Sequence, residues 1–266
     1  MNQEWELKKE IVEIGRRIWM RGYVAANDGN ISVVLNENEL LTTPTGVSKG
    51  FMSVEMILKV DRTGKMISAN SKYKPSSEIK MHLEVYKERP DIKSVVHAHP
   101  PYATSFAVAG IPLNKCVLPE AVLTMGAVPT AKYGLPSTKE IPDAIREHIK
   151  NSDVILLENH GALTLGSDLL TAYHRMETLE HTATIVWNAI QLGNLHVLPE
   201  YERDRLVALR GNFGLKGPVT VCDSTPMPSN ERPIPIAFSS GSGKKEVSEQ
   251  YIREITEKVL AKIKNI

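Results

Sequence analysis

Two short apolar runs constrain the fold of this chain more than any other feature. Residues 92–100, IKSVVHAHP, and residues 153–159, DVILLEN, are rich in β-branched or aliphatic side chains and are predicted to be buried strands. Further short strands are predicted near 30–35, 39–42 and 57–60, one after another along the chain. Consecutive strands favour antiparallel pairing, so we predict an α/β fold with a mostly antiparallel central sheet flanked by helices.

Helical periodicity separates these strands. Leu7, Ile11 and Ile14 recur at helical spacing, and Gly22 is placed to end that first helix. Ser137 and Glu140 have the S-x-x-E pattern of a capping box, which predicts a helix to about 150. Helices are also expected at residues 3–21, after Ser77 for about three turns, and at 101–110, 168–193 and 199–211. Residues 114–134 are expected to be short strands and loops, and the segment NHGALTLG is expected to be a loop.

The composition changes near residue 217. We predict a catalytic domain over residues 1–216, followed by a linker over 217–245 that is dense in proline, serine and glycine. Residues 246–266 are predicted to form an amphipathic helix, because apolar residues recur on one helical stripe. These are Ile252, Ile255, Val259, Leu260, Ile263 and Ile266.

Charge and cysteine content exclude several classes of protein. The 266-residue chain has a formal net charge of +1, so we expect neither nucleic acid nor a membrane surface as its partner. No run of apolar residues is long enough to span a bilayer, and the charged N-terminus does not resemble a signal peptide. Cys116 and Cys222 are far apart, so no disulfide framework is expected, and a reducing cytoplasm is the predicted location.

Three histidines suggest a metal site. His97 and His99 lie two residues apart on a predicted strand, where alternate side chains share a face, so both rings can converge on one ion. His160 follows another apolar strand directly and is the third candidate. Three neutral imidazoles with one open position are typical of catalytic zinc, whereas a pair of histidines alone is more often structural.

Polar residues at loop ends are the other candidates. Glu78 lies in the first turn of a predicted helix, where it can complete a metal shell or act as a general base. Ser76 and Ser77 precede it, and hydroxyls at a helix N-terminus also suit an anion, although simple capping is the plainer explanation. Further candidates in polar turns are Asn30, Thr45 and Gly46. Lys49 could supply charge, but a loop lysine is usually only solvated.

Five motifs together are more specific than any one of them. In order along the chain, GNIS, TPTG, SSE, HAH and NHG resemble the class II aldolase/adducin family, and most closely its metal-dependent sugar-phosphate aldolases of the L-fuculose-1-phosphate type. The resemblance spans about residues 5–195 and leaves 217–266 uncovered.

The resemblance implies a role for each matching position. It implies that His97, His99 and His160 bind one Zn²⁺, or another divalent metal, in each subunit, and that Glu78 is both resting ligand and catalytic acid/base. It implies a substrate-phosphate pocket formed by Asn30, Thr45, Gly46, Ser76 and Ser77. It further implies a homotetramer that cleaves a ketose 1-phosphate to dihydroxyacetone phosphate and an aldehyde such as lactaldehyde.

One departure from the family pattern leaves alternatives open. Fuculose aldolases carry a tyrosine after the HxH strand that protonates the leaving aldehyde, and KCVLPEAVL has none. Glu120 is a possible accessory group or only a surface glutamate, and Tyr133 and Tyr201 are other replacements. An L-ribulose-5-phosphate 4-epimerase, which has aspartate where Glu78 stands, a dehydratase of a phosphorylated thiosugar and an adducin-like binding protein are alternatives. Short motifs do not encode which sugar is cleaved.

The C-terminal extension is not needed for aldolase chemistry. A linker followed by an amphipathic helix resembles the encapsulation peptides of bacterial microcompartments that process fucose and rhamnose. The resemblance implies a shell protein as partner of residues 246–266 and a microcompartment as location; a helix folded back on the protein is the alternative.

Overall fold

Seven strands form one sheet in the computed structural model, which describes residues 3–68 and 72–226. The strand order is β3-β2-β1-β4-β7-β6-β5, and every neighbouring pair is antiparallel except β5 and β6. The predicted fold, a mostly antiparallel sheet flanked by helices, is confirmed. The strands are β1 Asn30–Val34, β2 Glu39–Thr42, β3 Leu58–Asp61, β4 Ser94–Ala98, β5 Thr130–Ala131, β6 Val154–Leu157 and β7 Gly161–Gly166.

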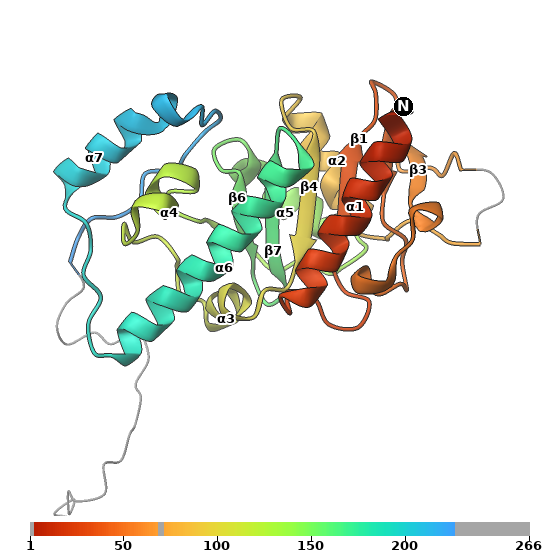
Figure 1. The fold of residues 1–266 in the computed structure, drawn as a ribbon. Coiled ribbons are helices and arrows are strands. Elements are labelled where there is room, and N and C mark those ends of the chain that lie inside the picture. The colour runs from red at the N-terminus through yellow and green to blue at the C-terminus, as the bar shows by residue number, and fades with distance from the viewer. Residues whose placement is uncertain (1–2, 69–71, 227–266) are drawn as a thin grey trace, which may run out of the picture. The chain divides into compact units, whose positions relative to one another are not determined.

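Helices cover both faces of the sheet (Figure 1). One core joins α1 (Gln3–Met20), α3 (Pro101–Ala109) and α6 (Leu169–Gln191) to one face, and a second core joins α2 (Ile79–Glu88) and α5 (Glu140–Ile149) to the other. Successive side chains of β4 (Ser94–Ala98) point to opposite faces of the sheet and so belong alternately to the two cores. Val95 belongs to the second core, while Val96 and Ala98 belong to the first. His97 therefore points to the same side of the sheet as α2.

Periodic apolar residues explain why these helices form where the sequence predicts them. The buried face of α1 consists of Ile11, Ile14 and Ile18 with Gly15 between them. The predicted start of α6 is also confirmed, because the Asp168 carboxylate accepts a hydrogen bond from the backbone N–H of Thr171 as an N-cap.

Three predictions about individual elements are wrong. Residues of the expected loop NHGALTLG form β7, which is fully buried between β4 and β6, because its apolar side chains complete both cores. Residues Pro119–Thr124 form a short helix, α4, in a stretch expected to be strands and loops. The capping box is absent as well: Ser137 has a left-handed φ of 69°, and Lys139 precedes α5 without a side-chain cap.

A third, small core lies beyond the edge of the sheet. It packs α4 near α7 (Glu200–Leu209). It also contains a single disulfide between Cys116 and Cys222, a pairing that the sequence analysis did not predict. The two cysteines are 106 residues apart, but bridges between Lys115 and Asp223 and between Gly126 and Thr220 align their segments. Short 3-10 helices complete the list: η1 Lys49–Phe51, η2 Val54–Met56 and η3 Arg210–Phe213.

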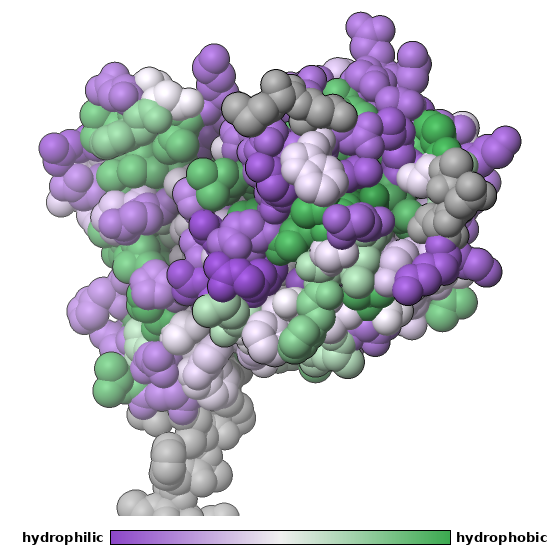
Figure 2. All heavy atoms as spheres, turned by 45° about the vertical axis from the view of Figure 1, so that its right-hand side comes forward, coloured by the Kyte–Doolittle hydropathy of each residue, from purple (hydrophilic) through white to green (hydrophobic). Residues whose placement is uncertain are grey.

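The predicted linker is described only over its first ten residues, 217–226. These residues run beside residues 114–116 and 126–127: the backbone N–H of Asp223 donates to the carbonyl of Asn114, and that of Ala127 donates to the carbonyl of Thr220. The predicted targeting helix, residues 246–266, lies outside the described residues. Within the described part of the chain, no helix is long and apolar enough to cross a membrane. Figure 2 shows hydrophilic and hydrophobic residues interspersed on one face of the protein.

Candidate metal centre

Two histidines lie at the end of the central strand. His97 is the fourth residue of β4, is fully buried, and pairs across the sheet with Asn30 on one side and Leu163 on the other. His99 follows directly after the strand, and its backbone N–H donates to the carbonyl of Tyr23, which holds it close to extended register. The two ring centroids are 4.9 Å apart, so both imidazoles face one point.

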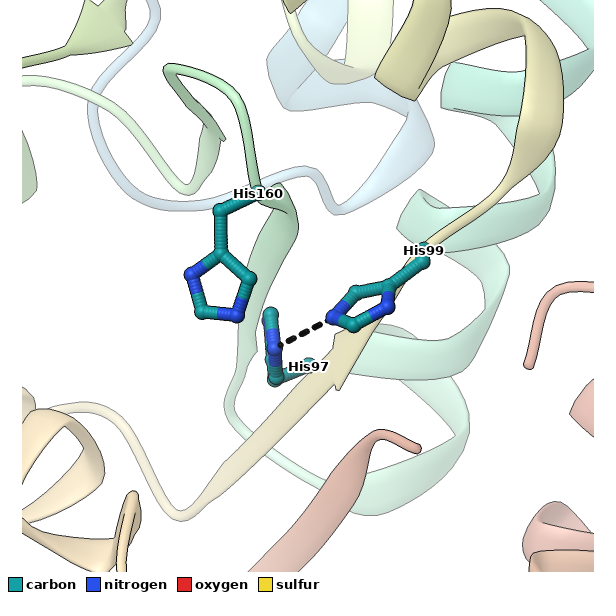
Figure 3. A group of neighbouring side chains, drawn as sticks. All are labelled: His97, His99 and His160. Atoms are coloured by element: carbon teal, nitrogen blue, oxygen red, sulfur yellow. Dashed lines mark hydrogen bonds between the residues drawn. The ribbon is translucent and has the colours of Figure 1, made fainter. Parts of the chain in front are cut away.

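The third histidine comes from the neighbouring strand pair. His160 lies in the turn from β6 to β7, where Asn159 adopts a left-handed φ of 55°. Its ring centroid is 4.7 Å from that of His97 and 5.1 Å from that of His99 (Figure 3). Gly161 makes this approach possible, because a Cβ there would lie 2.5 Å from Cδ2 of His99.

Hydrogen bonds orient two of the rings. His97 Nδ1 lies 2.9 Å from the carbonyl oxygen of Ala162, so it donates its proton there and leaves Nε2 free of hydrogen. His97 Nε2 then faces His99 Nε2 at 3.1 Å. On its outer side, His99 Nδ1 lies 3.6 Å from Oδ2 of Asp28. Metal-binding histidines commonly direct their second nitrogen to a carbonyl or carboxylate in this way.

Glu78 faces the same point from the N-terminal end of α2. Its Oε1 lies 3.2 Å from Nε2 of His160, and its Oε2 lies 3.6 Å from Nε2 of His97. The amide nitrogen of Asn30 donates to Oε2 at 3.0 Å, which fixes the carboxylate. Burial works against the charged form, but the nearby histidines lower the pKa of Glu78 to about 2. The carboxylate is therefore ionised at neutral pH.

These residues fit a divalent cation. The ligand atoms of the three histidines lie within 4.8 Å of one another. Glu78 Oε1 makes no hydrogen bond although it is buried next to His160, and burial lowers the pKa of His97 to about 3, so its ring is neutral. Neutral imidazoles and a buried, unsatisfied carboxylate oxygen are the donor set that Zn²⁺ prefers.

A cavity of about 250 Å³ extends from this cluster. Glu78, His99 and His160 line one part of it, and Thr45, Ser76 and Ser77 line another. The two hydroxyl-bearing loops are neighbours because Pro44 and Pro75 form a bridge and the Thr45 N–H donates to the carbonyl of Lys74. Two other predicted phosphate residues do not line it: Asn30 is buried behind Glu78, and Gly46 lies on the exposed part of its loop.

Several further lining residues, among them Asp28 and Ser137, were not singled out by the sequence analysis. Asp28 and Ser137 line the cavity, and the hydroxyl of Ser137 forms a hydrogen bond of 2.7 Å with that of Ser77. Lys49, for which the sequence left a source of charge and a solvated loop lysine as alternatives, lines the cavity and is only 1% exposed, so it is not solvated. The NDGN turn was the one available signal for Asp28; the contact of Ser137 depends on tertiary structure.

The proposed accessory groups do not reach the cavity within one chain. Glu120 is exposed on α4, and Tyr133 and Tyr201 are exposed at 54% and 65% of their surface. None of the three is among the residues that line the cavity. Among the described residues, Glu78 is therefore the lining carboxylate closest to the histidines.

Comparisons with known proteins identify relatives of this architecture. Residues 9–187 match the family model described as "Class II Aldolase and Adducin N-terminal domain". A 3-oxo-tetronate 4-phosphate decarboxylase of Haemophilus influenzae is 35% identical over 67% of this chain and 85% of its own length. An L-fuculose phosphate aldolase of Methanococcus vannielii is 37% identical over 66% of this chain and 93% of its own. Among solved structures, an L-fuculose 1-phosphate aldolase has a TM-score of 0.70 and 29% identity, covering 76% of this chain and 95% of that one.

Proposed function

The chain belongs to the class II aldolase and adducin family, and on that premise we propose that it is a zinc-dependent lyase that breaks a carbon–carbon bond in a phosphorylated ketose. The preferred reaction is aldol cleavage of a ketose 1-phosphate, L-fuculose 1-phosphate or a similar deoxy sugar, to dihydroxyacetone phosphate and an aldehyde. The observation that carries the proposal is the convergence of three imidazoles and Glu78 at one part of a cavity that is lined elsewhere by hydroxyls.

Each part of the cavity has a task in this reaction. A zinc ion held by His97, His99 and His160 supplies a Lewis acid for the negative charge that develops on oxygen when the bond breaks. Glu78 is ionised, and its unpartnered Oε1 can take up a proton and return it to the carbon of the enediolate. Asn30 holds the other carboxylate oxygen and so fixes the direction of that transfer.

The hydroxyl-lined part suits the phosphate of the substrate. Thr45, Ser76 and Ser77 present hydroxyls beside the N-terminus of α2, where the helix dipole favours an anion. Fixing the phosphate there would place the adjacent carbons toward the histidines. Binding of the phosphate, which does not react, would in this way orient the carbon–carbon bond that breaks.

Decarboxylation of a phosphorylated 3-oxo acid is the second candidate. Relatives named 3-oxo-tetronate 4-phosphate decarboxylase match this chain about as well as the aldolases do. Loss of carbon dioxide from a 3-oxo-tetronate 4-phosphate also leaves an enediolate, but it needs no group to take the proton from a hydroxyl that becomes an aldehyde. The absence of a tyrosine from the residues lining the cavity is consistent with this reaction.

One assay separates the two candidates. Full-length protein loaded with zinc is incubated with a panel of ketose 1-phosphates and with 3-oxo-tetronate 4-phosphates. The released aldehyde and carbon dioxide are measured, because dihydroxyacetone phosphate is the other product of both reactions. Aldolase activity is expected to depend on zinc, to be lost in His97→Ala and to fall at least about 100-fold in Glu78→Gln. Release of carbon dioxide from a 3-oxo-tetronate 4-phosphate, with no aldehyde released from any ketose, would replace the aldolase by the decarboxylase. Absence of both products, or full activity without metal, would overturn the proposal.

Two further parts of the proposal concern assembly. We expect a homotetramer, and we expect residues 246–266 to bind a shell protein of a bacterial microcompartment. The first expectation rests on family membership, and the second rests on the apolar stripe in the sequence of that segment. Retention of Glu78 rather than aspartate, together with all three histidines, disfavours the epimerase and the adducin-like binding protein.

A further inference from the structure

Lys49 is a buried lysine in the wall of the cavity. Its side chain is 1% exposed, and its ammonium donates to two backbone carbonyls, Asn27 at 2.9 Å and Val47 at 2.8 Å. These carbonyls belong to two different loops, the turn before β1 and the loop after β2. Burying a lysine is unfavourable unless its charge is used or compensated, so this arrangement calls for an explanation.

The two loops carry opposite parts of the site. The first contains Asp28, which faces His99, and Gly29, where a Cβ would lie 2.8 Å from the carbonyl oxygen of His97. The second contains Thr45, which lies beside the serines that precede α2. Because its ammonium bonds to both loops, Lys49 holds the turn that contains Asp28, next to His99, at a fixed distance from the loop that contains Thr45. It therefore fixes the distance between the metal ligands and the hydroxyl of Thr45.

The charge of Lys49 has a second effect on the cavity. No other lysine or arginine is among the described residues that line it. Burial lowers the pKa of Lys49 to about 8, while the carboxylates of Asp28 and Glu78 favour its charged form. The ammonium therefore remains largely protonated at pH 7 and offsets part of the repulsion between these carboxylates and an entering anion.

We propose that Lys49 is a positioning residue for the phosphate of the substrate, holding the Thr45 loop against the Asn27–Gly29 turn and supplying the cavity with positive charge. This inference rests on the proposed function and extends it to a residue outside the hydroxyl-bearing loops. The ligand it selects is a phosphate monoester, because the cavity that Lys49 lines also contains hydroxyls beside a helix N-terminus.

The first test measures binding of inorganic phosphate to zinc-loaded, full-length protein by calorimetry. Lys49→Met is expected to weaken binding about 10-fold or more, whereas Lys49→Arg, which keeps the charge, is expected to stay within about threefold of wild type. Lys59→Met is the matched control, because Lys59 is partly buried and paired with Glu4 but lies outside the cavity. In the activity assay, Lys49→Met should raise KM for the phosphorylated substrate more than it lowers kcat.

A second measurement does not require the methionine variant to fold. Phosphate affinity of wild type should fall between about pH 7.5 and pH 9.5, as Lys49 loses its proton while phosphate stays dianionic. Lys49→Arg should show a much flatter profile over the same range. Equal profiles for the two proteins, or unchanged affinity in a folded Lys49→Met, would overturn the inference and leave the proposed function intact. A zinc-loaded wild type that binds neither phosphate nor phosphorylated ketoses would overturn both.

Discussion

Gly161 is the residue that lets the three imidazoles approach one another. A Cβ at this position would lie 2.5 Å from Cδ2 of His99, 2.6 Å from the carbonyl oxygen of Ala98 and 3.3 Å from Cε1 of His97. Real Cβ contacts are not this short, so a side chain here must displace either a ring or the β4 backbone. The NHG motif thus contributes both the His160 imidazole and the space beside it.

Gly161→Ala is therefore expected to weaken zinc binding about 10- to 100-fold, a loss of the size seen when the groups that orient metal ligands are removed. Competition with a chromogenic chelator measures this affinity without reference to activity. Gly211→Ala is the matched control, because no atom lies within 4 Å of where its Cβ would be. Zinc affinity equal to wild type in Gly161→Ala would show that the rings tolerate the methyl group.

For individual residues of the site, the sequence predicts which side chains could act better than it predicts which other residues they contact. The two histidines of the HAH motif could be placed on one face because strand alternation is a local property. The neighbours of Asp28 and Lys49 could not be predicted, since their contacts depend on how two loops distant in sequence meet. A buried lysine in a polar loop looks the same in sequence as a solvated one.

Among the elements, α6 has the best-defined beginning. Both carboxylate oxygens of Asp168 are used: Oδ1 accepts from the backbone N–H of Thr171 at 2.7 Å, and Oδ2 accepts from its hydroxyl at 2.8 Å. The helix then runs for 23 residues and packs against β4 and β7. The cap therefore stabilises the layer that supports the strands beside the three histidines.

Asp168→Ala is expected to lower the free energy of unfolding by about 1 kcal/mol, the usual cost of losing an N-cap side chain. Urea denaturation followed by circular dichroism measures it. Lys139→Ala should change stability much less, because Lys139 occupies the N-cap position of α5 without a side-chain hydrogen bond. A loss as large in Lys139→Ala as in Asp168→Ala would contradict this explanation.

Elements with strong periodicity were the predictable ones. The spacing of isoleucines gave α1, and the apolar runs gave β4 and β6. β7 was missed because GALTLG begins and ends with glycine and follows a turn motif, so its pairing with β4 is decided by tertiary contacts. The six-residue α4 is too short to show a helical period.

For the molecule as a whole, the disulfide joins segments 106 residues apart in sequence. A cross-link over so long a loop restricts the unfolded chain strongly, and native disulfides typically contribute about 2–4 kcal/mol. Cys116→Ala/Cys222→Ala is expected to lose about this much stability, measured by chemical denaturation. Reducing agent should lower the Tm of wild type and leave that of the double variant unchanged; equal sensitivity of both proteins would contradict the prediction.

The predicted targeting helix is tested by transfer to another protein. Residues 246–266 fused to a fluorescent reporter should give discrete foci in a host that forms microcompartments, because an apolar stripe without its own core can dock in a groove. Replacement of Ile255 and Leu260 by glutamate should disperse the foci. Diffuse fluorescence of the unaltered fusion would count against a targeting role.

The disulfide also implies an order of events during synthesis. His97, His99 and His160 and the strands β4 and β7 beside them end at Gly166 or earlier, whereas Cys222 leaves the ribosome much later. Since chains emerge and begin to fold from the N-terminus, the part of the sheet that holds the imidazole cluster can form before the cross-link exists. Oxidation of the cysteines then fastens the last described stretch of chain to a sheet that has already formed.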